Sequence, residues 1–174
     1  MFESVPGLVV FADPPDSNDK HLAFSNRPEL VGGKLLAMNI RRLPAWILSA
    51  SHHAARAGIH PECCPLPMPP SEEMADNTEG SGALWWMTDG GKIRIDRWIR
   101  TEHLEPDVLN LLAEVGKAGP GVARLVSAVG RRNAASYDHD LATRFTAAQI
   151  RQMYERNPLW AEIERSAFGN LLCD

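Results

Sequence analysis

The chain has 174 residues, of which 44% are hydrophobic and 23% charged, and these values are typical of one globular domain with a buried core. The net charge of −4 argues against a general attraction to nucleic acid or to an anionic membrane. Three cysteines do not make a disulfide framework and favour a reducing compartment. No apolar stretch is long enough to cross a bilayer, and no basic segment precedes an apolar run at the N-terminus, so we expect a cytoplasmic protein.

The first part of the chain contains two predicted strands and a helix. Residues 7–12 form a short apolar run rich in β-branched residues, which ends at a proline-containing loop. Residues 34–40 form a second run, whose nearly continuous apolar character is typical of a strand buried in a parallel sheet. Pro44 then suits the first turn of a helix, which we expect to end at Gly58.

The middle of the chain shows weaker patterns. Residues 61–82 start with several prolines and continue as an acidic, polar tract, which predicts an excursion over the surface with one short helix near residues 71–74. Residues 83–87 look like a strand or loop that reaches a turn at 88–91. The alternation of polar and apolar residues over 92–99 predicts another strand.

The last part of the chain is predicted to be helical. Apolar residues at helical spacing indicate helices over 105–116 and 120–129, followed by a polar loop over 131–144. Thr146 and Gln149 have the spacing of a capping box, which opens a helix through about Tyr154. Asn157 and Pro158 predict the cap and first turn of a final helix that ends near Gly169. We find no internal repeat and expect residues 1–174 to form a single domain.

One segment combines residues that could bind an anion. Arg41 follows the predicted strand 34–40, and ligands of open α/β sheets bind at such strand ends. Ser49 follows eight positions later, in the second turn of the next helix. A guanidinium offers paired charged donors and a serine hydroxyl adds one more, so the two side chains would suit a phosphate group. The alternative is a strand-end arginine in a salt bridge and a serine on a helix surface.

This segment resembles the sulfotransferases that use 3′-phosphoadenosine 5′-phosphosulfate as the sulfuryl donor. Members of that family carry an arginine followed eight residues later by a serine at a strand–helix junction, and these two residues hold the 3′-phosphate of the donor. The matching residues are Arg41, Pro44, Ser49, His52 and His53, with Arg41 rather than Arg42 in register with Ser49.

Later segments extend the resemblance over roughly residues 20–170. Residues 96–107 are similar to the family's strand that ends in Arg-x-Glu-x-Leu, with Arg100, Glu102 and Leu104 at the matching positions. Residues 133–137 resemble the family's late loop that closes over the donor nucleotide, which implies contacts from Asn133, Ser136 and Tyr137. Residues 145–169 look like the family's closing helices.

The resemblance implies an α/β fold, with a P-loop-NTPase-like partial parallel sheet flanked by helices and a helical C-terminal half. It also implies sulfuryl transfer to a hydroxyl or amine of a small-molecule or carbohydrate acceptor, without a metal ion. The transfer needs a base to take the acceptor's proton. By position, His21 and Glu29 are the candidates for that base.

The chain departs from the family at one signature. The family's first phosphate loop, which reads Pro-Lys-x-Gly-Thr or a close variant, has no counterpart here. Three explanations stay open: the chain is truncated, another chain supplies the loop, or the protein has lost the chemistry. The alternative function is therefore a non-catalytic domain that binds a nucleotide phosphate, and a homo-oligomer paired through exposed sheet edges is a further expectation.

Overall fold

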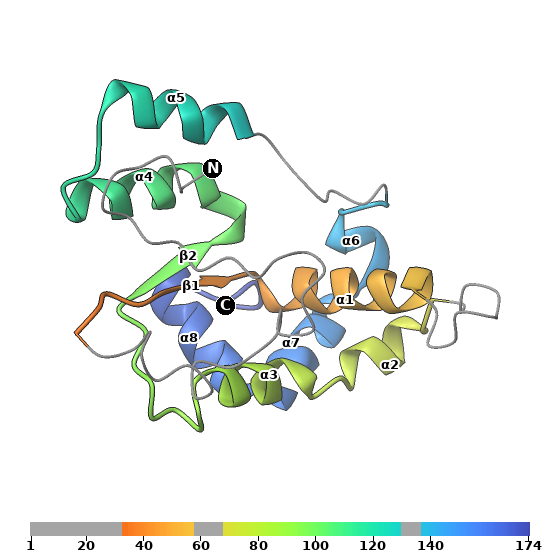
Figure 1. Ribbon diagram of the computed structural model, residues 1–174. Coiled ribbons are helices and arrows are strands. Elements are labelled where there is room, and N and C mark those ends of the chain that lie inside the picture. Colours follow the sequence, from red (N-terminus) through yellow and green to blue (C-terminus); the bar gives the residue numbers. More distant parts are fainter. Residues whose placement is uncertain (1–32, 58–67, 130–136) are drawn as a thin grey trace. The chain divides into compact units, whose positions relative to one another are not determined.

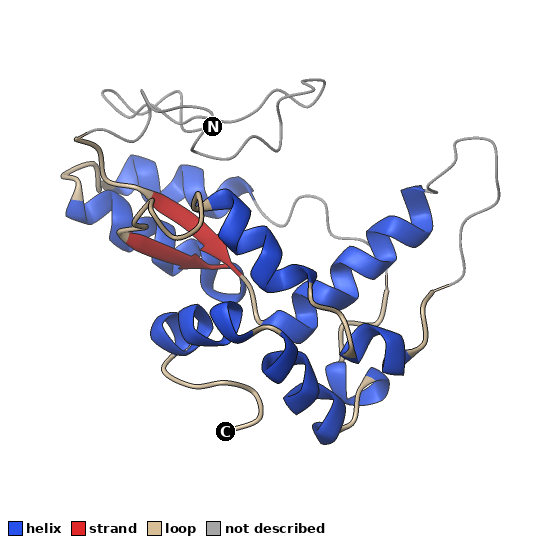
Figure 2. Ribbon diagram, turned by 90° about the horizontal axis from the view of Figure 1, so that it is seen from below, coloured by secondary structure: helices blue, strands red, loops and turns tan. Residues whose placement is uncertain are grey.

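A computed structural model of the protein describes residues 33–57, 68–129 and 137–174 (Figure 1). The described residues are mostly helical, and they include a two-stranded parallel sheet (Figure 2). The mixed α/β character expected from the sequence is therefore confirmed. The strand predicted over residues 7–12 lies outside the described residues.

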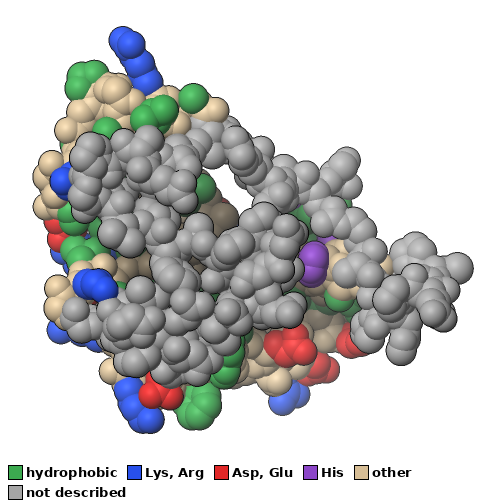
Figure 3. Space-filling view, viewed as in Figure 1, with side chains coloured by type: hydrophobic (Ala, Val, Ile, Leu, Met, Phe, Trp, Pro, Cys, Tyr) green, Lys and Arg blue, Asp and Glu red, His purple; other side chains and the backbone are tan. Residues whose placement is uncertain are grey.

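The chain divides into two compact units. One, here named the sheet unit, comprises Met1–Asn39 and Met87–Tyr137, and the other, the helical unit, comprises Ile40–Trp86 and Asp138–Asp174. Figure 3 shows both acidic and basic side chains on the described surface of one face. None of the helices in the described ranges has the length and apolar character needed to cross a membrane.

The sheet unit is built around two short strands. These are β1 (Ala37–Ile40, whose last residue belongs to the helical unit) and β2 (Arg97–Arg100). The carbonyl oxygen of Leu36 accepts hydrogen bonds from the backbone N–H groups of Asp96 and Arg97, at 2.9 and 3.1 Å. After β2 come the 3₁₀ turn η4 (Thr101–His103), α4 (Leu104–Glu114) and α5 (Pro120–Val129). Helix α4 packs against both β2 and α5, and buries Leu112.

Two predictions for this unit need adjustment. The strand predicted over 34–40 exists but starts only at Ala37, and the strand predicted over 92–99 is limited to Arg97–Arg100. The backbone N–H groups of Lys92 and Ile93 donate to the carbonyl oxygens of Asp89 and Thr88 instead. The backbone is left-handed at residues 89–91 of this turn. The turn engages the backbone N–H groups that a longer strand would need for hydrogen bonds to its neighbour. The helices predicted over 105–116 and 120–129 are confirmed.

The helical unit contains the largest group of buried side chains. Its elements are α1 (Leu43–Ala57), α2 (Ser71–Ala75), α3 (Glu79–Met87, whose last residue belongs to the sheet unit), α6 (Leu141–Arg144), α7 (Ala147–Arg156) and α8 (Pro158–Phe168). Helix α1 packs against α2, α7 and α8. Leu43 and Ile47, four residues apart on one face of α1, are both almost completely buried.

Most helix boundaries in this unit follow the sequence signals. The capping box is present: the Thr146 hydroxyl accepts from the N–H of Gln149, and the Gln149 side chain accepts from the N–H of Thr146. Helix α8 ends at Gly169, whose left-handed backbone has φ of 82°. The predictions for α1, for the short helix near residue 71, for α7 and for the extent of α8 are confirmed.

Two predictions for this unit are wrong, and a third is confirmed only in part. Residues 83–87 are helical rather than a strand or loop, and the predicted polar loop contains α6, which Asp140 caps by accepting from the N–H of Ala142 at 2.9 Å. Asn157 occupies the N-cap position of α8, as predicted, but its side chain does not cap this helix. Its Oδ1 accepts from the N–H of Ser81, and the Ser81 hydroxyl accepts from the N–H of Trp160. The N-terminal turns of α3 and α8 therefore cap each other.

This exchange of caps requires the two helices to approach closely at Gly80. A Cβ atom placed there would lie 2.9 Å from Leu43 Cδ1, 3.1 Å from Asn157 Oδ1 and 3.1 Å from Trp160 Cε3. Glycine lowers intrinsic helix propensity, and α3 contains two glycines, so the sequence pattern alone does not predict this helix. Contacts with α1 and α8 override that local preference.

We predict that Gly80→Ala lowers the free energy of unfolding by about 1–3 kcal/mol, because the added methyl group overpacks the junction of α1, α3 and α8. Chemical denaturation followed by circular dichroism measures the loss. Gly82→Ala is the matched control, since a Cβ atom at Gly82 meets nothing within 4 Å and alanine raises helix propensity. Equal effects of the two substitutions would contradict the close approach at Gly80.

Candidate functional site

Arg41 and Arg42 connect β1 to α1 and have separate environments. The first hydrogen bond of α1 runs from the N–H of Trp46 to the carbonyl oxygen of Arg42, at 2.9 Å. The carbonyl oxygen of Arg41 lies outside this pattern and accepts from the indole Nε1–H of Trp160, at 3.0 Å. The strand therefore turns into the helix over only two residues, and both are fixed by contacts with other parts of the chain.

The Arg42 side chain is fully engaged in the structure. Its Nη1 donates to Glu164 Oε1 at 3.0 Å and to the carbonyl oxygen of Asn170 at 2.7 Å, and its Nη2 donates to Asn170 Oδ1 at 2.8 Å. The guanidinium carbon also lies 4.1 Å from the centre of the Phe168 ring, a cation–π geometry. Arg42 therefore ties the start of α1 to the end of α8 and the residues after it.

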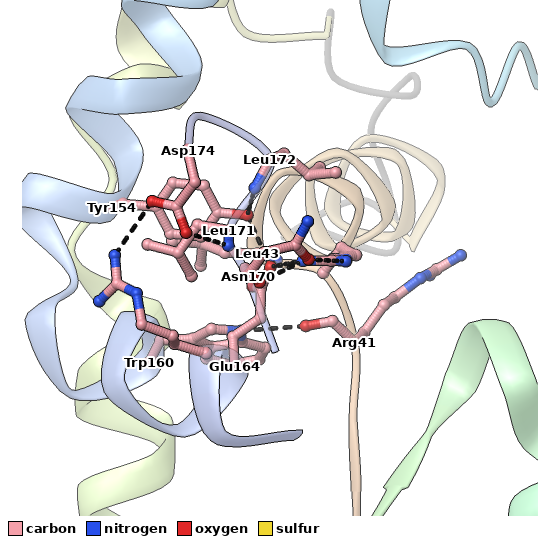
Figure 4. A network of polar contacts seen from close by, with 11 residues as sticks. Arg41, Leu43, Tyr154, Trp160, Glu164, Asn170, Leu171, Leu172 and Asp174 are labelled. Carbon is pink, nitrogen blue, oxygen red and sulfur yellow. Dashed lines mark hydrogen bonds and ion pairs between the residues drawn. The ribbon is translucent and has the colours of Figure 1, made fainter. Parts of the chain in front are cut away.

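Glu164 is the centre of a buried polar cluster (Figure 4). Its carboxylate is completely buried and accepts from the backbone N–H of Leu43 at 2.8 Å, from the Tyr154 hydroxyl at 2.7 Å and from Arg42. We refer to Arg42, Leu43, Tyr154, Glu164 and Asn170 as the Glu164 cluster. Burial raises the pKa of Glu164, and the three donors work against this increase. Burial, followed by the nearby charge of Glu164, raises the pKa of Tyr154 far above its usual value.

The Arg41 side chain points away from the Glu164 cluster (Figure 4). Its Nε atom is buried and has no hydrogen-bond partner among the described residues. A buried donor without a partner carries a free-energy cost of about 1–3 kcal/mol, which a ligand oxygen could remove. Within the described ranges, Arg41 Nε is therefore a donor that remains for a ligand, whereas the Arg42 guanidinium is already paired.

Ser49 is the seventh residue of α1 and is half-buried. Across the described ranges, no hydrogen bond joins the Arg41 and Ser49 side chains. Ser49 lies about 9 Å along the helix axis from the first residue of α1, given the rise of an α-helix. The structure thus places both residues in the helical unit, on either side of the start of α1, without bringing them into contact.

The two histidines singled out with Ser49 lie one turn further along α1. His52 and His53 are three and four positions beyond Ser49 and therefore share its side of the helix. Burial lowers the pKa of His52, and the positive charges of Arg144 and His139 lower it further. Two basic residues, Arg144 in α6 and His139 shortly before it, thus act on this part of α1.

The other residues predicted for the site are placed as follows. His21, Glu29, Asn133 and Ser136 lie outside the described residues. Tyr137 is partly exposed and belongs to the sheet unit. Within the described ranges, no group of three or more His, Cys, Asp or Glu side chains could hold a metal ion.

The segment that resembles the Arg-x-Glu-x-Leu strand contains a tight ion pair in the sheet unit. Arg100 Nε and Nη2 donate to the two carboxylate oxygens of Asp107, at 2.8 and 2.7 Å, and the N–H of Arg100 donates to Asp107 as well. These contacts fix the end of β2 to the first turn of α4. Hydrogen bonding from Arg100 lowers the pKa of Asp107, and burial opposes this decrease only partly.

The sequence analysis did not assign a role to Trp160 or Glu164. The two residues lie four positions apart in α8 and are both buried. A charged residue on the apolar side of a predicted amphipathic helix is the signal that could have identified Glu164. The contacts of Trp160 and Glu164 with Arg41 and Leu43 span about 120 residues of sequence, and no local pattern predicts them.

A groove of about 580 Å³ lies along α7, α8 and the last residues of the described chain. Its lining includes Arg151, Glu162 and Arg165. None of the site residues predicted from the sequence lines this groove, and it therefore adds nothing to the site around Arg41.

We predict that Glu164→Gln lowers the free energy of unfolding by about 1–3 kcal/mol, because the amide NH₂ group would face a backbone or side-chain donor that the carboxylate now satisfies. Urea denaturation measures the difference. Glu162→Gln on the exposed side of the same helix should leave stability nearly unchanged. A stable Glu164→Gln variant would contradict the three-donor description of the cluster.

The Arg100–Asp107 pair should make stability depend on acid pH. Because the folded-state pKa of Asp107 is lowered, its contribution is present above the ordinary aspartate pKa of about 4 and is lost as the pH falls through the lower folded-state value. We expect Asp107→Asn to cost about 1–2 kcal/mol at pH 7 and progressively less as the pH falls below the ordinary aspartate pKa. Denaturation of both proteins across this range measures the difference, and a constant difference would contradict the assignment.

Comparison with known proteins adds no assignment to this description. No family model, no curated protein and no solved structure matches the chain. The function must therefore be argued from the residues and their geometry.

Proposed function

We propose that this chain is a sulfotransferase-like protein that binds the 3′-phosphate of 3′-phosphoadenosine 5′-phosphosulfate through Arg41 and Ser49. The observation that carries the proposal is the environment of Arg41, the residue that follows β1 and lies before α1. Its buried Nε atom has no partner among the described residues. An arginine held in this way is suited to a doubly charged phosphate.

The position of Arg41 adds a second favourable factor. The N-terminus of an α-helix carries partial positive charge and unpaired N–H groups, both of which favour anions. Helix α1 has 15 residues and no acidic residue in its own first turn, but the N–H of Leu43 already donates to Glu164 and Pro44 has no N–H. The favourable factor is therefore limited to the partial positive charge of the helix end. A phosphate between Arg41 and Ser49 would lie beside this end of the helix.

The choice between the two arginines rests on two separate arguments. The eight-residue spacing to Ser49 selects Arg41 from the sequence. The geometry of the cluster also favours Arg41 as the residue that binds the phosphate, because Arg42 already donates to Glu164 and Asn170. This agreement supports the proposal without depending on the similarity of the remaining segments.

The chemical part of the proposal assigns the transfer of a sulfuryl group to a hydroxyl or amine of a small-molecule or carbohydrate acceptor. His21 or Glu29 would take the acceptor's proton, and Asn133, Ser136 and Tyr137 would contact the nucleotide. A P-loop-NTPase-like arrangement of the sheet belongs to the same proposal. The second candidate is a non-catalytic domain that binds nucleotide phosphate, which the missing Pro-Lys-x-Gly-Thr loop favours.

Isothermal titration with adenosine 3′,5′-bisphosphate tests the binding step. We expect micromolar binding by the full chain, and a loss of about 10–100-fold in affinity for Arg41→Ala because charged hydrogen bonds to the phosphate disappear. Ser49→Ala should cause a smaller loss of about fivefold.

Arg151→Ala is the matched control, since Arg151 is an exposed arginine of the same unit far along the sequence from Arg41. It should bind as the unsubstituted chain does. Absence of binding by the folded chain would overturn both candidate functions at this site. Binding without sulfuryl transfer to any of a panel of acceptors would favour the non-catalytic candidate.

A further inference from the structure

Trp160, in α8, holds the main chain at Arg41 in place through a hydrogen bond. Its indole Nε1–H donates to the Arg41 carbonyl oxygen at 3.0 Å. That oxygen follows β1 and precedes the first hydrogen bond of α1, which starts at the carbonyl of Arg42. The indole therefore occupies the acceptor that neither the strand nor the helix uses, and it fixes the orientation of the peptide group after Arg41.

The same helix fixes the next peptide groups. Four residues further along α8, Glu164 accepts from the backbone N–H of Leu43 at 2.8 Å. Positions four apart lie on one face of a helix, so Trp160 and Glu164 hold both ends of the three-residue turn that starts at Arg41. With its backbone held on both sides, Arg41 has a restricted set of directions for its side chain, and Figure 4 shows it pointing away from the Glu164 cluster.

Trp160 is fixed by ring packing and by a backbone hydrogen bond. Its ring lies against the ring of Trp46, with centroids 4.9 Å apart and planes tilted by 43°. Its backbone N–H donates to the Ser81 hydroxyl, and a methyl group at Gly80 would come within 3.1 Å of its Cε3 atom. Trp160 is 4% exposed. Because the Trp160 side chain is packed so tightly, the Arg41 carbonyl group to which it donates is also held in a defined position.

We propose that Trp160 is a positioning residue for the anion site, which it serves by holding the Arg41 carbonyl so that the guanidinium faces the 3′-phosphate. This inference rests on the proposed function, and it goes further by assigning a role to a residue that does not touch the nucleotide. Preorganisation of a binding group raises affinity because less rotational freedom is lost when the ligand binds. The indole N–H, rather than the bulk of the ring, is the group that matters.

Trp160→Phe separates these two properties, because it keeps an aromatic ring and removes the donor. The readout is the ratio of dissociation constants for adenosine 5′-monophosphate and adenosine 3′,5′-bisphosphate, which isolates the contribution of the 3′-phosphate. We expect the ratio to fall about fivefold to tenfold in Trp160→Phe. We expect it to stay unchanged in Trp86→Phe, where an exposed tryptophan is replaced. In the double variant with Arg41→Ala, the loss should not exceed that of Arg41→Ala alone.

The outcomes distinguish this inference from the function on which it rests. An unsubstituted chain that does not discriminate between the two nucleotides overturns the proposed function and the inference together. If Arg41→Ala abolishes the discrimination while Trp160→Phe keeps it, the inference alone is overturned. Equal weakening of both nucleotides by Trp160→Phe, or additive losses in the double variant, would show a purely structural role and would overturn it as well.

A measurement on the unsubstituted chain covers the case in which Trp160→Phe does not fold. The indole N–H signal of Trp160 can be assigned by elimination with Trp→Phe variants of the other four tryptophans. Adenosine 3′,5′-bisphosphate should slow hydrogen exchange at this indole, and the 5′-monophosphate should not, because only a ligand on Arg41 stabilises the turn. Exchange that is unaffected by the bisphosphate, at concentrations that saturate the protein, would overturn the inference.

Discussion

The helical unit depends on one buried carboxylate. Glu164 is completely removed from solvent, and an ionised group in such a place is tolerated only when charged and hydrogen-bonding partners surround it. The partners come from the start of α1, through Arg42 and Leu43, and from α7, through Tyr154. Each of these segments must be correctly placed for the carboxylate to be satisfied, so Glu164 links the packing of three helices to a single electrostatic requirement.

Glu164 also affects residues that it does not contact, because its contacts fix the position of helix α8. Because Glu164 fixes the position of α8 against α1, it also fixes Trp160 beside Arg41, and it brings the first turn of α8 against the first turn of α3. There the two helices satisfy each other's N–H groups through Asn157 and Ser81, with Gly80 allowing the approach. Contacts within α8 thus determine how β1 ends and how α1 begins.

Local signals predicted the elements whose stability is local. The capping box at Thr146, the proline at the start of α8 and the glycine at its end all specify helix boundaries without help from distant residues. The predictions from the sequence were wrong where the structure depends on contacts beyond the local pattern. Helix α3 contains two glycines and gains its cap from Asn157, and the turn at Thr88 ends the alternating pattern before β2. For the site, the spacing to Ser49 selects Arg41, which stays a prediction, whereas the long-range contacts of Trp160 and Glu164 have no local signal in the sequence.

The proposed division of roles between the two adjacent arginines, Arg41 and Arg42, is consistent with these energetics. Arg42 neutralises a buried charge, and turning it toward a ligand would leave Glu164 unpaired, a change that costs about 3–5 kcal/mol. A phosphate ligand that first had to break the cluster would lose this amount from its free energy of binding, which corresponds to more than a hundredfold in affinity. In the proposed site, a second cation at the same turn removes this conflict, because Arg41 would bind the anion while Arg42 stays on Glu164. Structural and ligand-binding charges can thus be neighbours in sequence when their side chains leave the main chain in different directions.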